Sequence, residues 1–359
     1  MSGFDGLRVG VVGPVPPPAG GMAMQTRQLV QLLDGERAKV SLVQTNRPYR
    51  PAWIGRFVGL RALFRLVPYM LALWRTAGRV DVLHVMANSG WSWHLFAVPA
   101  VWIARFRSVR VIVNYRGGEA ASFLQRSAGL VRATVRRASS VVVPSEFLRE
   151  VFGRHGMAAQ IVPNVVDLSR FHPGPRAEPP QIIVARNLEP IYDNATALRA
   201  FAMLRASMPG VRLLIAGTGP QEASLRALAA ELGVTAGVSF VGRLSADEMA
   251  LRLRESAVAL NPSTVDNMPN SVLEAMASGV PVVSTDVGGI PFIVSDQRSA
   301  LLVPAGDAGA MARALERVLR DAALADKLRR NGLQDVLAYT WPAVRTRLGA
   351  AYGLQGAGR

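Results

Sequence analysis

The sequence predicts an α/β protein of two domains, each built around a parallel β-sheet. Its 359 residues exceed the length of one typical domain and suit two. Short β-branched runs alternate along the chain with longer stretches of helical periodicity, which is typical of doubly wound sheets. Residues 172–180, the richest proline stretch, separate two such series. We therefore assign residues 1–172 to an N-terminal domain and residues 173–339 to a C-terminal domain, and expect a helix within residues 340–359 to pack back on the first.

The strands of each series can be placed by their apolar, β-branched runs. In the first domain we expect strands at residues 8–12, 80–85, 110–113, 140–143 and 160–162, and a helix that includes residues 24–33. In the second we expect strands at residues 181–185, 211–216, 238–241, 258–260, 281–284 and 300–303. The helices expected there are residues 196–207, 221–232, 246–255, 272–277 and 308–319. Two such sets predict two Rossmann-like halves that face a central cleft.

Composition narrows the class of protein and its partners. Half of the residues are hydrophobic and 18% are charged, so the chain can bury sizeable cores and general disorder is excluded. Lys and Arg number 41 against 25 Asp and Glu, and the net charge of +16 predicts anionic partners such as nucleotide phosphates or acidic lipids. The arginines lack the interleaved aromatics of a nucleic-acid module, so we expect no nucleic-acid partner.

Several kinds of chemistry and location are disfavoured by the same sequence. The absence of cysteine excludes disulfides and thiol catalysis. The four histidines show no metal-ligand spacing, so we expect no metal site. The first residues do not form a signal-peptide pattern, and apolar runs stay shorter than the ~20 residues of a spanning helix. We therefore expect a cytoplasmic location.

The most informative segment is residues 261–283, NPSTVDNMPNSVLEAMASGVPVV. Asp266 lies in an expected loop after a strand, and Glu274 lies in the helix that follows. Backbone amides near residues 270–272 would present the positive end of this helix to a phosphate, and Glu274 can accept two hydrogen bonds from a ribose. A second interpretation is a capping box, in which Ser271 and Glu274 only satisfy backbone donors of the helix.

Residues 261–283 resemble the E-x7-E region of the retaining glycosyltransferases of family 4, which have the GT-B fold, and residues 275–294 resemble its continuation. Similar segments occur in the same order at residues 16–29, 142–152, 162–173, 213–233 and 238–249. The resemblance implies two Rossmann-like doubly wound domains facing a central cleft. It also implies metal-independent transfer of a sugar, with retention of configuration, from a nucleotide diphosphate-sugar to a glycan, a lipid-linked or a small-molecule acceptor. The donor expected is a UDP- or GDP-sugar, used as substrate without a cofactor.

The resemblance assigns roles to individual residues. It places Arg186 at the donor phosphates, Asp266 at the hydroxyls of the donor sugar, and Arg243 and Leu244 at the base through backbone groups. Asp266 replaces the first Glu of the motif and is one methylene shorter. The donor-binding residues implied are Gly20, Gly21, Arg243, Leu244, Asn267, Met268, Pro269, Asn270, Ser271, Val272 and Glu274. Gly20 and Gly21 would let the backbone approach the diphosphate; the alternative is a plain Pro/Gly turn.

Two departures from the family pattern bear on activity. Residues 186–194 contain no Lys, whereas the family commonly has one as a second phosphate clamp. Arg116 stands where the family usually has a His, so we expect it to supply positive charge as a third catalytic residue beside Arg186 and Asp266; the alternative is a solvated surface arginine. Two other functions stay open: a non-hydrolysing nucleotide-sugar epimerase, and a non-catalytic scaffold subunit that binds nucleotide sugar.

Residues 53–75 form an apolar segment with regularly spaced arginines. We expect it to contact an anionic membrane through Arg56, Arg61 and Arg65, beside a lipid-linked acceptor at the inner face of the cell membrane, as in polysaccharide biosynthesis. The alternative is an ordinary helix that packs its apolar side on the sheet. Pro68 is expected to end or kink the helix.

Overall fold

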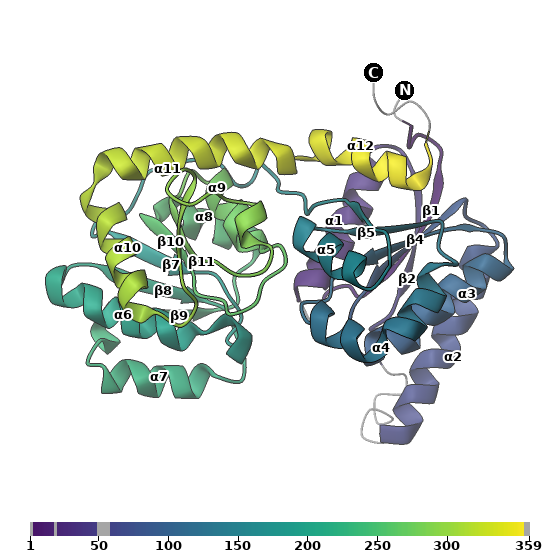
Figure 1. Cartoon of the computed structure of the whole chain (residues 1–359), viewed down its shortest axis with the longest axis horizontal. Coiled ribbons are helices and arrows are strands. Elements are labelled where there is room, and N and C mark those ends of the chain that lie inside the picture. The colour runs from purple at the N-terminus through teal and green to yellow at the C-terminus, as the bar shows by residue number, and fades with distance from the viewer. Residues whose placement is uncertain (1–2, 18–19, 49–57, 355–359) are drawn as a thin grey trace. The chain divides into compact units, whose positions relative to one another are not determined.

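Two six-stranded sheets form the framework of the chain, and the neighbouring strands of both sheets are parallel (Figure 1). The computed structural model describes residues 3–17, 20–48 and 58–354, with side chains in the third range described from Phe64 onward. The chain divides into two units, Met1–Asn164 with Val344–Arg359, and Val165–Ala343. Residues 165–172, which the sequence assigns to the N-terminal domain, belong to the second unit, because Val166 and Phe171 are buried in its core.

The sheet of the first unit has the strand order β2-β1-β3-β4-β5-β6. Its strands are β1 (Arg8–Gly13), β2 (Lys39–Gln44), β3 (Val82–Ala87), β4 (Arg110–Tyr115), β5 (Ser140–Val143) and β6 (Gln160–Ile161). The helices are α1 (Gly21–Gly35), α2 (Val58–Ala77), α3 (Val98–Phe106), α4 (Ala120–Val135), α5 (Glu146–Arg154) and α12 (Trp341–Tyr352). Strand order reverses between β1 and β3, so ligands are expected at the carboxyl ends of these strands.

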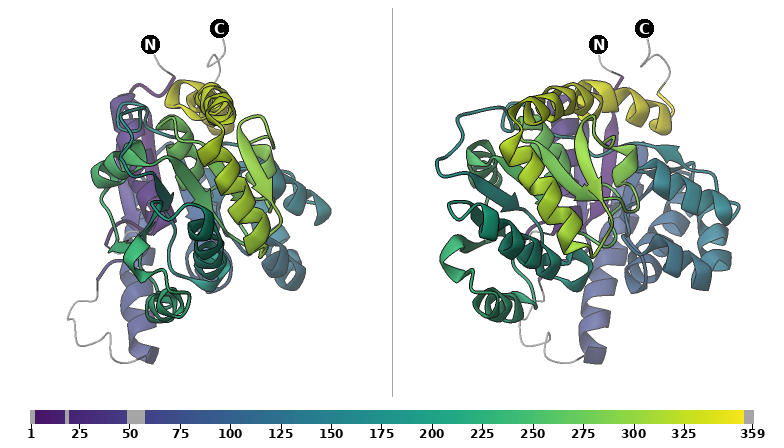
Figure 2. Two further views of the ribbon diagram at one scale, coloured as in Figure 1. Left: turned by 90° about the vertical axis from the view of Figure 1, so that its left-hand side faces the viewer. Right: turned by 60° about the vertical axis from the view of Figure 1, so that its left-hand side comes forward.

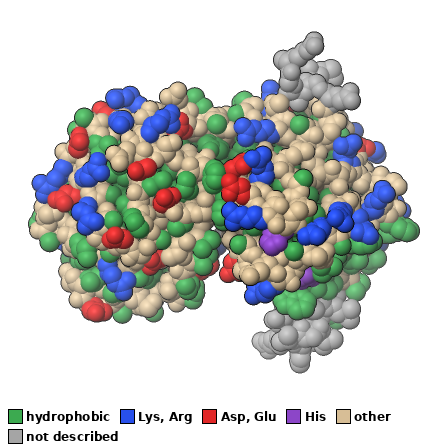
Figure 3. All heavy atoms as spheres, in the orientation of Figure 1, with side chains coloured by type: hydrophobic (Ala, Val, Ile, Leu, Met, Phe, Trp, Pro, Cys, Tyr) green, Lys and Arg blue, Asp and Glu red, His purple; other side chains and the backbone are tan. Residues whose placement is uncertain are grey.

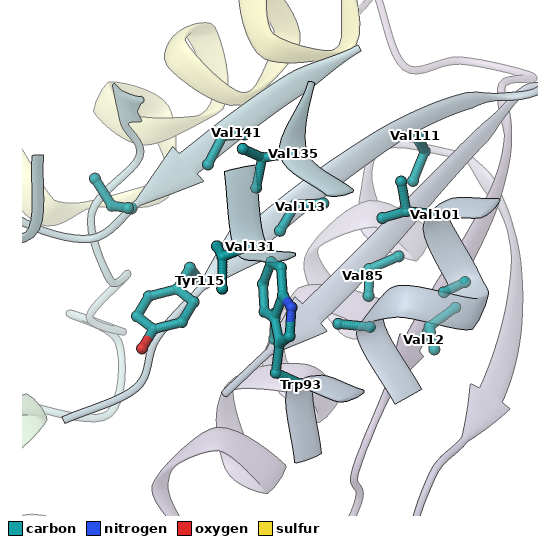
Figure 4. Close-up of a cluster of buried hydrophobic side chains, with 14 of the residues drawn as sticks. Val12, Val85, Trp93, Val101, Val111, Val113, Tyr115, Val131, Val135 and Val141 are labelled. Atoms are coloured by element: carbon teal, nitrogen blue, oxygen red, sulfur yellow. The ribbon is translucent and has the colours of Figure 1, made fainter. Parts of the chain in front are cut away.

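One face of this sheet forms a core with α2, α3, α4 and α5. Figure 4 shows Trp93 in this core among valine side chains of β3, β4 and α4. Leu83 and Val85 of β3 also face this core. Because side chains alternate along a strand, His84 points to the opposite face, where it contacts Tyr352 of α12. Figures 1 and 2 show helices on both sides of each sheet.

The sheet of the second unit has the order β12-β11-β10-β7-β8-β9. Its strands are β7 (Gln181–Val184), β8 (Arg212–Ala216), β9 (Val238–Gly242), β10 (Val258–Asn261), β11 (Val282–Thr285) and β12 (Ala300–Val303). The helices are α6 (Asn194–Ser207), α7 (Glu222–Glu231), α8 (Ala246–Glu255), α9 (Asn270–Ala277), α10 (Ala308–Arg320) and α11 (Ala322–Asp335). Renumbered from β7, this is the strand order of the dinucleotide-binding fold, with its reversal between β7 and β10.

Two buried clusters cover the two faces of this second sheet. One contains apolar side chains of α6, α7 and α10, and the other contains those of α8 and α9. The prediction of two Rossmann-like, doubly wound α/β domains is therefore confirmed. Among the residues described, the structure contains no helix whose length and apolar character would let it cross a bilayer.

The structure departs from the predicted elements at three places. Strand β2 was not predicted, because as an edge strand it carries the polar residues Lys39, Ser41 and Gln44 and is mostly not buried. Helix α11 was not predicted either. Helix α2 does not end at Pro68 but continues through it to Ala77, which leaves a kink as the remaining expectation.

Candidate active site

The predicted phosphate-binding residue Arg186 follows β7 at the strand reversal of the second sheet. Across this reversal β7 pairs with β10, and the loop after β10 carries Ser263 and Asp266. In parallel sheets this edge is where ligands bind, because the strands end there and the connecting loops separate to either side. The strand order thus brings together two loops that are far apart in sequence.

Three polar side chains and one aromatic ring contact the Arg186 guanidinium. Its Nε and Nη2 donate to Ser263 Oγ at 3.2 and 3.0 Å, and Nη1 donates to Ser271 Oγ at 3.3 Å. Nη2 also forms an ion pair with Asp266, and the Tyr192 ring centroid lies 4.4 Å from Cζ. Burial lowers the pKa of Arg186 to about 10, which leaves the group cationic at neutral pH. Arg186 is therefore a fixed positive charge, with its side chain only 10% exposed.

Ser263 is itself oriented by a chain of hydrogen bonds at the end of β10. Its hydroxyl donates to Asn261 Oδ1 at 2.8 Å, and Asn261 Nδ2 donates to Ser284 Oγ of β11 at 3.1 Å. The carbonyl of Ser263 accepts from Thr285 Oγ1 at 2.6 Å. Ser263 therefore presents lone pairs to Arg186. The sequence pattern did not predict a role for Ser263 or Tyr192, because neither belongs to a motif with a charged or glycine signature.

The loop that carries Asp266 rests on two glycines after β11. A Cβ on Gly288 would lie 2.1 Å from the carbonyl oxygen of Asp266, and one on Gly289 would lie 1.7 Å from that of Asn267. The Gly289 N–H donates to the Asp266 carbonyl at 2.8 Å. Backbone contact of this kind is open only to glycine, so the tight packing fixes where Asp266 can place its carboxylate.

Helix α9 begins beside Arg186 and is not capped by Ser271. Its N-cap is Pro269, and the capping-box interpretation is wrong because Ser271 already lies inside the helix. The Ser271 hydroxyl instead accepts from Arg186. The positive end of α9 and a buried guanidinium thus meet at one place, an arrangement that suits a phosphate group.

Glu274 lies further along α9 and is partly buried. Burial raises the pKa of its carboxyl to about 7, although the charges of Arg186 and Arg170 oppose this shift. An acid with this pKa changes its charge near neutral pH, so its ability to accept two hydroxyl donors depends on pH. No side-chain cap accounts for Glu274, and its predicted contact with a ribose stays a prediction.

The other predicted donor-binding residues of this segment divide into two groups. The side chains of Met268 and Val272 are buried in the core that covers α9, so only their backbone atoms are candidates for ligand contact. Asn267 is also buried, whereas Asn270 is partly exposed. Pro269 supplies the extended N-cap conformation that directs the loop into the helix.

Arg243 and Leu244 follow β9, two strands from β7. Arg243 is exposed and donates from Nη2 to Thr218 Oγ1 at 3.2 Å, while Leu244 is partly buried. Thr218 lies between two glycines of the loop after β8. A Cβ on Gly217 would lie 2.0 Å from the carbonyl oxygen of Arg186, and one on Gly219 2.4 Å from that of Leu188. The loop after β8 therefore contacts the loops after β7 and β9, and neither glycine was predicted as a site residue.

Two of the predicted residues of the first unit, Gly20 and Gly21, lie at the start of α1. Gly20 is the N-cap of α1 and Gly21 its first residue; both are exposed, and a Cβ on either would meet no atom of a described residue within 4 Å. Neither has a positive φ, so left-handed turn geometry does not explain them. The close approach of a ligand to these two glycines stays a prediction.

Arg116 follows β4, and its side chain contacts α1. Its Nη1 donates to Gln25 Oε1 of α1 at 2.5 Å and to Asn164 Oδ1, and its Nε donates to Asn114 Oδ1 at 3.0 Å. It is partly buried, and burial lowers its pKa to about 10. Arg116 is therefore not a freely solvated surface arginine. Its partners Gln25 and Asn164 carry no sequence signature that would have identified them.

Within the ranges that the structure describes, no group of three or more His, Asp or Glu side chains is arranged to hold a metal ion.

Two family models match the chain in succession. The model described as "Glycosyltransferase Family 4" matches residues 19–170, and the model described as "Glycosyl transferases group 1" matches residues 165–335. Together with two Rossmann-like units, these matches define the class of protein as a glycosyltransferase with the GT-B fold. The chain belongs to glycosyltransferase family 4.

Individual relatives agree with this class. Glycogen synthase from Mycobacterium tuberculosis is 28% identical over 290 residues, which cover 76% of this chain and 69% of that protein. A GDP-mannose-dependent alpha-(1-6)-phosphatidylinositol monomannoside mannosyltransferase from the same organism is 27% identical over 373 aligned positions, covering 94% and 96%. The fold is similar to that of Anabaena HepE, solved in complex with UDP and glucose, with a TM-score of 0.74, 15% identity and coverage of 97% and 99%.

Proposed function

We propose that this glycosyltransferase moves a sugar from a nucleotide diphosphate-sugar to a glycan or lipid-linked acceptor, with retention of configuration. The observation that carries the proposal is the meeting of the buried Arg186 cation with the N-terminus of α9, with Glu274 one turn further on. A diphosphate at this place would be neutralised by Arg186 and the helix end, while Glu274 accepts hydrogen bonds from the ribose.

The same groups can promote the bond cleavage. As the glycosidic bond breaks, negative charge grows on the leaving diphosphate, and a cation held rigidly before the reaction stabilises that charge. Asp266 already forms an ion pair with Arg186, which suits it to hydroxyl binding and charge compensation rather than covalent attack. The route we propose is attack of the acceptor on the same face that the diphosphate leaves, with the diphosphate taking the proton of the acceptor hydroxyl.

A UDP- or GDP-sugar is the proposed donor. Two comparisons support this choice: one relative is named as GDP-mannose-dependent, and the structure of HepE was solved in complex with UDP. A thermal-shift screen of UDP-, GDP-, ADP- and dTDP-sugars tests the choice, because a ligand that binds the folded state raises its melting temperature by mass action. Conversion of the donor sugar without acceptor would favour an epimerase, and binding without turnover on any acceptor would favour a scaffold subunit.

Turnover should survive removal of divalent cations. In the proposed mechanism Arg186 and the start of α9 carry the charge that a metal ion would otherwise neutralise. We expect the rate of nucleotide release to be unchanged after dialysis against EDTA. Loss of activity that added Mg²⁺ or Mn²⁺ restores would contradict this part of the proposal.

We also propose that the first unit contacts an anionic membrane, through α2 and α3. Phe64, Val67, Leu71 and Trp74 recur at helical spacing on α2 and are 41–53% exposed, on a different face from the buried Tyr69 and Leu73. On α3, Trp102 and Phe106 are 46% and 77% exposed. Figure 3 shows apolar and basic side chains side by side on the surface of this unit. Exposed apolar side chains that gather on neighbouring helices, rather than lying singly, are typical of a binding surface.

Arginines stack on the aromatic members of this patch. Arg107 Cζ lies 4.9 Å from the Trp74 ring centroid, and Arg137 Cζ lies 4.0 Å from that of Trp102. Apolar side chains flanked by cations are typical of helices that bind at the headgroup boundary. Of the predicted contact residues, Arg56 and the side chain of Arg61 lie outside the described part, and Arg65 is only partly exposed. The described residues therefore favour a contact centred on Trp74, Trp102 and their arginines.

Vesicle binding by a double variant checks this contact. Leu71→Glu with Trp74→Glu should weaken co-sedimentation with anionic vesicles about tenfold, because it adds charge of the wrong sign and removes apolar burial. Binding by the unchanged protein should fall as salt is raised. The matched control is Met203→Glu with Leu337→Glu, two residues of the second unit that are each 54% exposed. Equal binding by both double variants would place the contact elsewhere or remove it.

A further inference from the structure

We propose that Tyr352 of α12 is a positioning residue that fixes the guanidinium of Arg116 through His84 and Asn114. The inference rests on the proposed function, because it supposes that Arg116 acts in the transfer reaction. Its four residues come from β3, β4, the loop after β4 and the C-terminal helix, all within the first unit.

Three hydrogen bonds connect Tyr352 to Arg116. The Tyr352 hydroxyl lies 2.9 Å from His84 Nδ1, His84 Nε2 lies 3.0 Å from Asn114 Nδ2, and Asn114 Oδ1 lies 3.0 Å from Arg116 Nε. His84, Asn114 and Tyr352 are 0%, 2% and 2% exposed. The chain of contacts therefore runs through the interior, on the face of the sheet opposite the main apolar core.

The guanidinium of Arg116 determines which group donates and which accepts in each of these three hydrogen bonds. A guanidinium can only donate, so Asn114 must present Oδ1 to Arg116 and its NH₂ group to His84. His84 Nε2 must then accept, which leaves the ring proton on Nδ1 to be donated to the Tyr352 hydroxyl. Burial and the charge of Arg116 lower the pKa of His84 to about 3, so the ring is neutral at physiological pH.

Tyr352 favours the tautomer of His84 with its proton on Nδ1, because the Tyr352 hydroxyl accepts a hydrogen bond from that nitrogen. Without an acceptor at Nδ1, the neutral ring would gain by moving its proton to Nε2, where the Asn114 carbonyl can accept it after the amide rotates. The rotated amide would turn its NH₂ group toward Arg116 Nε, and Arg116 would lose one of its three side-chain acceptors. A hydroxyl on the last helix thereby helps to hold a cation at the end of β4.

Tyr352→Phe is the decisive variant, and Tyr69→Phe is its matched control. Tyr69 is 3% exposed in the same unit and donates to the Phe96 carbonyl at 2.7 Å, but its hydrogen bond does not lead toward Arg116. Two spectroscopic readouts need no turnover: the ¹⁵N shifts of His84, which distinguish its tautomers, and the hydrogen exchange of Arg116 Nε–H, assigned by its loss in Arg116→Lys. We expect Tyr352→Phe to move the His84 shifts toward the Nε2–H tautomer and to accelerate the exchange about tenfold, and Tyr69→Phe to change neither.

Turnover then connects positioning to function. The probes are UDP-glucose and GDP-mannose, with release of UDP or GDP as the signal. We expect Tyr352→Phe to lower kcat about 10- to 100-fold with little change in KM, and to have no further effect in the Arg116→Ala background. Unchanged shifts and exchange in Tyr352→Phe would overturn the positioning role. Altered shifts and exchange with full activity in Arg116→Ala would instead leave the chain of contacts standing and remove Arg116 from the proposed function.

Discussion

Replacing Arg186 by alanine should lower the turnover of the nucleotide sugar by about 10²- to 10³-fold, the usual effect of removing one preorganised group that stabilises developing charge. The dissociation constant of the donor should rise much less. The reason is that the diphosphate gains charge as the glycosidic bond breaks, and interactions that strengthen in the transition state contribute to kcat. Steady-state turnover and calorimetric titration of the donor separate the two quantities.

Controls for this variant exist within the same unit. Arg226 also forms an ion pair, with Glu222 at 2.9 Å, and stacks on Phe240 with 4.6 Å between Cζ and the ring centroid, but it lies on α7. Arg226→Ala should leave turnover unchanged. Arg186→Lys keeps the charge but loses the paired contacts to Ser263 and Ser271, so its activity should fall between the other two. Wild-type turnover in Arg186→Ala would remove this residue from the reaction.

The second large effect is expected on donor binding when Glu274 is replaced. Glu274→Ala should raise the dissociation constant of the nucleotide sugar at least tenfold, because two hydrogen bonds from the ribose to a charged acceptor are lost. The helix should remain folded, since its N-cap is Pro269 and does not involve Glu274. Calorimetric titration gives the affinity, and thermal unfolding gives the stability. Wild-type affinity in the alanine variant would rule out the ribose contact.

The raised pKa of Glu274 predicts opposite pH dependences for the stability of the protein and for its affinity for the donor. Between the unfolded value near 4.5 and the folded value of about 7, the folded state keeps a proton that the unfolded state has lost. Stability from this group is therefore lost as pH rises through about 7, whereas donor affinity should increase over the same range because the carboxylate is the better acceptor. Glu274→Gln should reduce both dependences. An affinity that is equally pH-dependent in the Gln variant would assign the titration to another group.

Features that depend on local pattern could be predicted from the sequence. Residues directly after buried strands of a parallel sheet must gather at one edge, so the strand pattern is enough to place Arg186 and Asp266 in loops at that edge. The order of the second sheet then explains why those two loops meet. Membrane contact by residues 53–75 was also expected from spacing and stays a prediction; the exposed apolar side chains that the structure describes lie further along α2 and on α3.

Features that depend on distant contacts could not be predicted in this way. Gln25 is separated from Arg116 by 91 positions, and His84 from Tyr352 by 268, so these pairs form only when the strands and α12 are assembled. Ser263 is a common residue whose importance comes from the guanidinium it faces. The spacing of Ser271 and Glu274 even favoured a capping box, which the extended Pro269 prevents by starting the helix earlier.

The four glycines at the loops of the second sheet bear on how this enzyme can be changed by directed evolution. Added Cβ atoms at Gly217, Gly219, Gly288 and Gly289 would lie 2.0, 2.4, 2.1 and 1.7 Å from neighbouring backbone oxygens, so every side chain, even alanine, would displace main chain. A library that randomises them would consist largely of misfolded members. Substitutions at Arg243 and Leu244 are better candidates for such a library, because neither side chain takes part in these glycine contacts.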